Sequence, residues 1–341
     1  MTETDPTPWP KVFGAAALLT VIISVLLTAF AWPSVRSSVH DVPIAVAGPA
    51  AAVEQVTSAL EAKMPDAFEV TVVADTAAAE QLILDREVYG AIDLSTGAPQ
   101  ILTASAASAS VAQTLQGVGT ALSQAAAPDA GTTVTVRDLA ALPADDPRGA
   151  GLAAAALPLV MSGMLTAVLM TRLVRGTGRR IVGALAFAVA GGLAITAILQ
   201  FWFGSLDGSY LTNVGAISLT VAATSFTLLG LESLLGYPGL GLGAVIMMLI
   251  GNPLSGSATA PEMLPGWSGA LGQLLPPGAG GQLLRSVAFF DGHGSAHAII
   301  VLAAWLAVGL ALCVAGGVRS RRTAAAITAE APKETAVPLA V

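Results

Sequence analysis

Charge and cysteine are both scarce in this chain of 341 residues. Only 11% of the residues are Asp, Glu, Lys or Arg, whereas 54% are hydrophobic. A soluble domain carries about a quarter charged residues, so this composition excludes an ordinary soluble protein and indicates an integral membrane protein. The one cysteine, Cys313, lies in the last apolar run. It excludes a disulfide framework and a multi-cysteine metal site within one chain.

Ionisable residues are almost absent from the interiors of the apolar runs. Proton relays in membranes use Asp, Glu, His or Lys inside the spans, where each costs about 2.5–3.5 kcal/mol on insertion scales. Glu232 lies near the end of a run; snorkelling to the interface explains it, with a coupling role as the alternative. A proton-coupled carrier is therefore disfavoured. A Walker motif is also missing, so we expect no enzyme activity and no cofactor bound by this chain.

Long apolar runs are what the sequence contains. A helix needs about 20 residues to cross about 30 Å of hydrocarbon. Residues 12–32 form the first candidate, which we interpret as an uncleaved anchor because it is longer than the apolar core of a signal peptide; a cleaved signal, ending at Ala29-Phe30-Ala31, is the alternative. Further candidates cover 151–171, 181–203, 212–235 and 298–318. Residues 240–251 are too few to cross alone.

Two arginine clusters decide the expected number of crossings. The first occupies the loop 172–180 and the second follows the last run, and their members are Arg172, Arg175, Arg179, Arg180, Arg319, Arg321 and Arg322. Cytoplasmic loops are enriched in arginine, and both clusters are cytoplasmic only if a sixth crossing lies near 240–258. Irregular backbone there must be buried in protein or face water.

The expected topology is a polytopic helical protein of a bacterial cytoplasmic membrane with six transmembrane helices, surrounded by membrane lipids. Residues 1–11 are a short cytoplasmic N-terminus, 151–318 contain the last five helices, and 319–341 are a disordered cytoplasmic tail. The net charge of −7 gives no reason to expect a nucleic-acid partner.

Residues 33–150 separate the first two runs and carry the acidic excess. Strand patterns at 42–48, 68–75, 89–95, 99–105 and 132–139 are interleaved with helix patterns at 50–64, 76–88 and 109–127. This order predicts a small extracytoplasmic α/β domain, with Thr76 as the cap of its second helix. The turn "AGPAAAVEQV" lacks the glycines and lysine of a phosphate loop, so we do not expect a nucleotide site.

A polar, proline-rich segment, "GNPLSGSATAPEMLPGW" at 251–267, follows the short run. We expect residues 259–290 to form two short helices that re-enter the outer leaflet and are broken at Pro276-Pro277. Glu262 begins the first helix, where an acid suits the helix dipole. An external gate is the alternative role for this segment, and its candidate residues are Asn252, Pro261, Glu262 and Pro265.

This order of segments resembles the type-2 ABC-transporter permeases, in the branch of phage-infection-protein-like membrane proteins. The resemblance rests on "AEQLILDREVYGAIDL" (79–94) and on "LSGSATAPEMLPGWSGALGQLLPPGAGGQLLRSVAF" (254–289), in which Gly256, Pro261, Leu264-Pro265, Pro276-Pro277 and Leu284-Arg285 match the family segment. The motifs cover about a tenth of the chain. Two features depart from the family: "MTETDPTPWPK" is too short for a surface helix, and the strand at 91–95 is not followed by proline.

The resemblance implies the permease subunit of an ATP-driven exporter of a lipid-like or apolar substrate or a cell-envelope component, dimeric and paired with a separate cytoplasmic ABC ATPase. It implies that the ATPase docks on the loop containing Arg172, Arg175, Arg179 and Arg180, with topology setting and lipid contact as the alternative. It also implies a substrate path lined by Met161, Met164, Met247 and Met248, although methionine more often fills gaps in the packing. A non-transporting scaffold or receptor, whose external domain binds an envelope partner, is the alternative function.

Small residues and histidines give two weaker signals. Ala303, Ala307, Ala311 and Ala315 form one stripe at helical spacing, and Ala184, Ala188 and Gly192 form another. We expect both to pack within the chain, with a homodimer seam as the alternative. His293 and His297 are four apart, as in zinc sites. The neighbouring Gly292 and Gly294 favour a polar loop instead.

Overall fold

Within the described residues, 7–125 and 134–330, the computed structural model contains five helices long and apolar enough to cross a membrane. They are α1 (Trp9–Val35), α5 (Ala150–Leu173), α6 (Thr177–Ala197) with its π-helical continuation η2 (Ile198–Trp202), α7 (Tyr210–Leu235) and α11 (Ala296–Glu330). All five long runs of the sequence are thus helical, and the chain is a multi-pass membrane protein.

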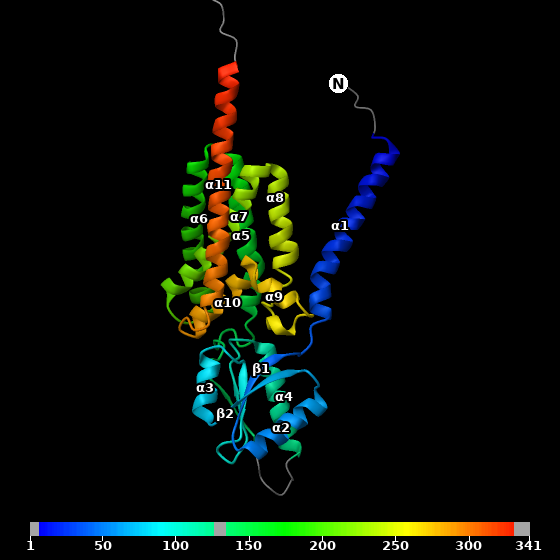
Figure 1. Cartoon of the computed structure of the whole chain (residues 1–341), viewed down its shortest axis with the longest axis vertical. Coiled ribbons are helices and arrows are strands. Elements are labelled where there is room, and N and C mark those ends of the chain that lie inside the picture. The colour runs from blue at the N-terminus through cyan, green and yellow to red at the C-terminus, as the bar shows by residue number, and fades with distance from the viewer. Residues whose placement is uncertain (1–6, 126–133, 331–341) are drawn as a thin grey trace, which may run out of the picture.

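The helix α7 is the axis of the bundle. Among the described helices, five pack against it: α5, α6, α8 (Tyr237–Ala244), α10 (Pro276–Phe289) and α11. Of its most apolar stretch, 78% is buried within the protein. By contrast, the more apolar α1 stands apart from the bundle (Figure 1), and none of its corresponding stretch is buried. Lipid is the medium that suits such a surface.

The two stripes of small residues differ in their surroundings. Ala184, Ala188 and Gly192 are buried between α6 and α7, which confirms packing within the chain. The stripe Ala303, Ala307, Ala311 and Ala315 is exposed on α11, so our expectation that it packs within the chain is wrong. The opposite face of α11 makes that contact instead, because Gly309 lies so close to the Phe226 backbone that a Cβ there would collide with it.

The helix α8 (8 residues) continues into the π-helical η3 (Val245–Gly251, 7 residues). At 1.5 Å per residue the pair spans at most about 23 Å, less than an ordinary bilayer core. Figure 1 shows this pair running beside the bundle, from the end where α7 stops to the end where α9 (Ser268–Gln273) lies. It therefore returns the chain along the bundle without reaching the length of a standard span.

The far end of α11 corrects a second expectation. Residues 319–341 were expected to form a disordered tail, but the helix continues to Glu330. The stretch after the arginines is rich in alanine, the strongest helix former, so the helix has no local reason to stop. Residues 331–341 lie outside the described residues.

The α/β domain has the elements that its sequence predicts. Its strands are β1 (Val42–Ala47), β2 (Phe68–Val73), β3 (Gly90–Asp93), β4 (Gln100–Thr103) and β5 (Thr135–Asp138), in the sheet order β2-β1-β3-β4-β5. All neighbours are parallel except β3 and β4, which are antiparallel. Its helices are α2 (Ala50–Lys63), α3 (Thr76–Leu84) and α4 (Ala109–Ala125).

The helices cover both faces of the sheet. Val53 of α2 and Leu115 of α4 pack with Ile44 on one face, whereas Ile83 of α3 packs with Ala45 on the other. Because β1 and β3 are covered on both sides, their residues are almost all buried, as is usual for parallel strands. The sheet thereby gives the domain a rigid frame.

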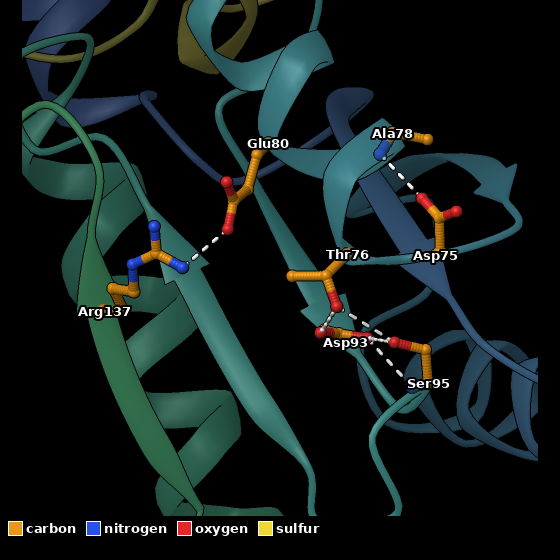
Figure 2. A network of polar contacts seen from close by, with 7 residues as sticks. All are labelled: Asp75, Thr76, Ala78, Glu80, Asp93, Ser95 and Arg137. Carbon is orange, nitrogen blue, oxygen red and sulfur yellow. Dashed lines mark hydrogen bonds and ion pairs between the residues drawn. The ribbon is translucent and has the colours of Figure 1, made fainter.

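A buried carboxylate fixes the carboxyl end of β3 (Figure 2). Asp93 accepts hydrogen bonds from the Thr76 hydroxyl at 2.6 Å, and from the Ser95 backbone N–H at 2.9 Å and its hydroxyl at 2.6 Å. Burial alone raises the pKa of Asp93, but these three hydrogen bonds favour the charged form and lower the pKa below its usual value. The predicted cap Thr76 is wrong, since Asp75 caps α3 by accepting from the Ala78 N–H.

The α/β domain lies at one end of the bundle, with α9 and α10 between the two (Figure 1). We call this the domain end. The opposite end holds the loop 172–180 and the second half of α11, which meet where Gly317 touches Thr177. We call it the arginine end.

Candidate functional site at the domain end

Arg86 links the α/β domain to α10. It follows α3 in a left-handed conformation with φ 63°, which turns its side chain toward the bundle. Its guanidinium donates to the Gln282 carbonyl oxygen at 3.1 Å, to the Gln282 side-chain oxygen at 2.6 Å and to the Ser286 hydroxyl at 2.6 Å. It also lies 5.0 Å from the centre of the Phe290 ring. Burial lowers the pKa of Arg86, and the nearby Tyr89 and Glu262 oppose that effect; an arginine still stays charged.

Tyr89 makes the second link. Its hydroxyl donates to the Glu262 carboxylate at 2.7 Å, across 173 residues of sequence. Burial raises the pKa of Tyr89 well above its usual value, and the negative Glu262 raises it further. The phenol therefore stays neutral and remains a donor to the carboxylate.

Glu262 does not begin a helix of the expected kind. It lies in a single 3₁₀ turn, η4 (Pro261–Met263), and the first short α-helix, α9, begins only at Ser268. The prolines at 261 and 265 stop a continuous helix over this stretch. The predicted break at Pro276-Pro277 is the first turn of α10. The structure thus confirms two short α-helices with a break directly before Pro276, and it corrects the start of the first one from Glu262 to Ser268.

The four predicted gate residues do not form one cluster. Glu262 and the buried Pro261 face the α/β domain, where the adjacent Met263 joins the domain's apolar core. Pro265 lies between η4 and α9, and its carbonyl oxygen accepts from the Ser268 hydroxyl. Asn252 ends η3, and its side-chain oxygen is buried without a hydrogen-bond partner among the described residues.

The histidine loop joins the same junction. His293 lies 2.7 Å from the Asp85 carboxylate, next to Arg86 in the α/β domain. Across the part of the chain that the structure describes, no cluster of three or more His, Cys, Asp or Glu side chains suits a metal ion. His293 therefore contacts the domain, as expected of a polar loop.

Arg285 of α10 has a different environment. One of its nitrogens donates to the Ser257 carbonyl oxygen at 2.6 Å, and among the described residues no carboxylate forms an ion pair with it. Its side chain lines two adjoining cavities. Arg86, Tyr89 and Arg285 were not singled out as site residues from the sequence.

The arginine end places the four loop arginines in three environments. Arg180 lies 3.1 Å from Glu232 of α7 and also donates to the carbonyl oxygens of Val174 and Thr171. Arg172 lies 5.3 Å from the centre of the Tyr237 ring. The exposed Arg175 and Arg179 form no ion pair within the described ranges. Glu232 thus has a specific partner rather than a merely interfacial position.

The four methionines do not line a common path. Met247 is fully buried, Met161 is 40% exposed, and Met164 and Met248 are partly buried. None of them lines the cavities at the domain end. Met164 packs against the apolar core of the bundle, in agreement with a gap-filling role.

A larger hollow lies in the α/β domain, between α2 and α4. Its volume is about 600 Å³, within the range of small-molecule sites. Apolar side chains such as Val56, Leu60 and Leu122 line it, with Gln55 and Lys63 as polar groups. This hollow has room for an apolar ligand or for a side chain of a partner.

Comparisons with known proteins identify no relative. No protein-family model matches the chain, and neither the curated proteins nor the solved structures contain a significant match.

Proposed function

We propose that the chain is the permease subunit of an ATP-driven exporter of the type-2 ABC class, acting as a dimer with a separate cytoplasmic ATPase. The observation that carries the proposal is the position of α10. This helix packs against α5, α7 and α11, and it receives the hydrogen bonds of Arg86 from the external domain. A displacement of the bundle helices is thereby transmitted to the α/β domain through α10.

The proposal includes a sixth crossing and a cytoplasmic arginine end. The helix α8, η3 and the turn at 252–258 complete the crossing, with Asn252 and Ser255 enclosed by the bundle and α9. The close approach of Thr177 and Gly317 supports a common side for both arginine clusters. Both termini are then cytoplasmic, and the α/β domain lies outside a bacterial inner membrane.

Energy for transport comes from the partner subunit in this proposal. Glu232 is paired to Arg180 at the arginine end, so it does not serve as a proton carrier. Arg172, Arg175 and Arg179 form the docking surface for acidic groups of the ATPase, and Arg180 holds the loop to α7. The exposed alanine stripe of α11 is the seam for a second permease chain, because small residues allow close helix contact.

A triple variant tests the docking surface. We expect wild-type protein, purified in mild detergent from its own host, to retain an ABC ATPase detected by mass spectrometry. The variant Arg172→Gln/Arg175→Gln/Arg179→Gln should lose most of it, whereas Arg321→Gln/Arg322→Gln, which removes charge from the same end, should not. Recovery of wild-type protein without any ATPase contradicts the export function. Undiminished recovery with the triple variant contradicts the docking role alone.

Cysteine labelling tests the topology that the proposal needs. The native Cys313 is buried, which gives a low background. Single cysteines introduced at Arg175 and Arg321 should react only after the membrane is permeabilised, whereas one at Thr96 in the α/β domain should react in intact spheroplasts. Labelling of positions 175 and 321 from opposite sides rules out the sixth crossing.

The hollow between α2 and α4 favours a second candidate, a receptor whose external domain binds an envelope component. The variant Gly117→Leu tests it. Open space surrounds a Cβ at this position, and leucine is the better helix former, so the variant should fold while filling the hollow. Loss of envelope ligands captured by wild-type protein, with ATPase recovery absent in both, favours the receptor over the exporter.

A further inference from the structure

Arg285 is a cation with incomplete compensation. A guanidinium has five N–H donors, and the described residues give Arg285 one hydrogen bond, to the Ser257 carbonyl oxygen. Among the neighbouring charged groups, Arg86 has the strongest electrostatic interaction with Arg285, and it is also positive. Arg285 is partly buried, and removing a cation from water without an opposing charge is costly. An anion that is not part of this chain would complete its environment.

The first cavity beside Arg285 is polar and positively charged. It has a volume of about 90 Å³ and lies between the α/β domain, the start of α5 and the turn at 257–259. Its walls include Arg148, Arg285, Ser105 and Thr259, and no acidic side chain. The nearby Asp146 caps the start of α5, because its two carboxylate oxygens accept hydrogen bonds from the backbone N–H groups of residues 150 and 151. The cavity therefore suits an anionic group.

The second cavity adjoins the first and is apolar. The two share Leu152, Ser257 and Arg285 as lining residues. Its remaining walls come from α5, α7, α10 and their neighbours, and they are Ala156, Leu159, Val160, Thr220, Pro277, Gly281 and Leu284. Its volume is only about 20 Å³, so a bound chain requires α5 and α10 to separate slightly. Arg285 stands where the charged and the apolar spaces meet.

We infer that the domain end binds an amphiphile with an anionic headgroup. Arg285 and Arg148 hold the headgroup, and the apolar cavity between α5 and α10 takes the first part of its hydrocarbon chain. A purely apolar ligand would leave both guanidinium groups without a counter-charge, and a purely soluble anion would leave the apolar cavity empty. The site stands independently of the ATPase partnership, because a receptor would hold the same amphiphile.

Lipid retention by the full chain tests this site. Purified protein in a neutral detergent is incubated with phosphatidylglycerol or with phosphatidylcholine of the same acyl chains, and retained lipid is counted by native mass spectrometry. We expect wild-type protein to prefer phosphatidylglycerol. Arg285→Gln should lower its retention about tenfold, because a hydrogen bond between charged groups in a partly buried site is lost. The exposed Arg148 should contribute less.

Matched variants distinguish loss of a specific lipid site from a general loss of positive charge and from misfolding. Arg137→Gln removes the same charge from an exposed ion pair with Glu80 in the same domain, and it should leave lipid retention unchanged. Gly281→Ala places one methyl group at the wall of the apolar cavity without changing charge, and open space around its Cβ allows the fold; it should lower retention of phosphatidylglycerol. This variant decides the matter if Arg285→Gln does not fold.

Four outcomes would overturn the inference. The first three are equal retention of the two lipids by wild-type protein, equal losses in Arg137→Gln and Arg285→Gln, and unchanged retention in both Arg285→Gln and Gly281→Ala. Displacement of the lipid by excess glycerol phosphate would also overturn it, because the site would then recognise a soluble anion. Failure of ATPase capture leaves this test untouched, so the two proposals fail separately.

Discussion

Arg86 at the domain end and the pair Arg175 and Arg179 at the arginine end have opposite environments. At the domain end, Arg86 is enclosed and gives its N–H groups to Gln282 and Ser286 of α10. At the arginine end, Arg175 and Arg179 are exposed and have no ion pair within the described ranges. The first arrangement joins two parts of one chain, and the second leaves cations open to another molecule. Arg86 therefore forms a joint within the chain, whereas Arg175 and Arg179 belong to the docking surface that we propose.

The largest effect is expected from breaking the joint with Arg86→Gln. The shorter side chain leaves the oxygens of Gln282 and Ser286 without their donor, which we expect to cost about 3 kcal/mol of local stability. Hydrogen exchange of the full chain in detergent should show faster exchange at 276–290. Arg137→Gln is the control, since an exposed ion pair contributes under about 1 kcal/mol. Equal protection in both variants would show that the domain is held by other contacts.

A smaller effect, about 2 kcal/mol, is expected when the domain itself is weakened by Asp93→Asn. Because hydrogen bonds lower the pKa of Asp93 in the folded domain, its contribution is full above the unfolded pKa of about 4 and is lost as the pH falls below it. The protection factors of the β3 amides, which are corrected for the intrinsic pH dependence of exchange, should therefore fall in acid for wild-type protein and change less for the variant. The same acid response in both would exclude Asp93 as its source.

At the arginine end, Glu232→Gln should lower the free energy of unfolding by about 1 kcal/mol. Arg180 keeps the carbonyl oxygens of Val174 and Thr171, so the loss is limited. The reaction of Cys313 with a thiol reagent during thermal unfolding in detergent measures it, because this thiol is buried. Adding Arg180→Gln to Glu232→Gln should cost further stability, since it removes the remaining bonds. A double variant as stable as wild type would show that the pair contributes nothing.

The smallest change in stability, under about 0.5 kcal/mol, is expected for Arg175→Gln/Arg179→Gln. The same variant should still lose much of its ATPase recovery, and this contrast is what distinguishes a docking surface from a joint. Thermal unfolding and co-purification should be measured on one preparation. A variant that is markedly destabilised would place these arginines in the fold rather than at an interface.

Local patterns were sufficient to predict the elements of the α/β domain. Alternating apolar residues in 68–75 and the helix formers in 76–88 each act over a few residues, and the structure confirms β2 and α3 there. The preceding residue Asp75 replaced Thr76 as the cap, an error of one position. Helix boundaries are commonly uncertain by that amount.

The contacts of the candidate site could not be predicted in the same way. Tyr89 and Glu262 are 173 residues apart, and Arg180 and Glu232 are 52 apart, so no local pattern connects them. One signal was present in the sequence: Arg285 is the only charged residue between Glu262 and Asp291. A single cation in such an apolar stretch marks a functional position. The exposure of the α11 alanines could not be predicted either, because the spacing of residues identifies a helix face but not what covers that face.

The axial helix α7 reaches both ends of the bundle. Thr220 lines the apolar cavity at the domain end, and Glu232, twelve residues later, is paired with Arg180. These two positions are about 18 Å apart along one uninterrupted helix. The helix therefore provides a stiff connection between the loop at 172–180 and the wall of the cavity. The distance between the two ends is bridged by the stiffness of one helix rather than by a relay of side chains.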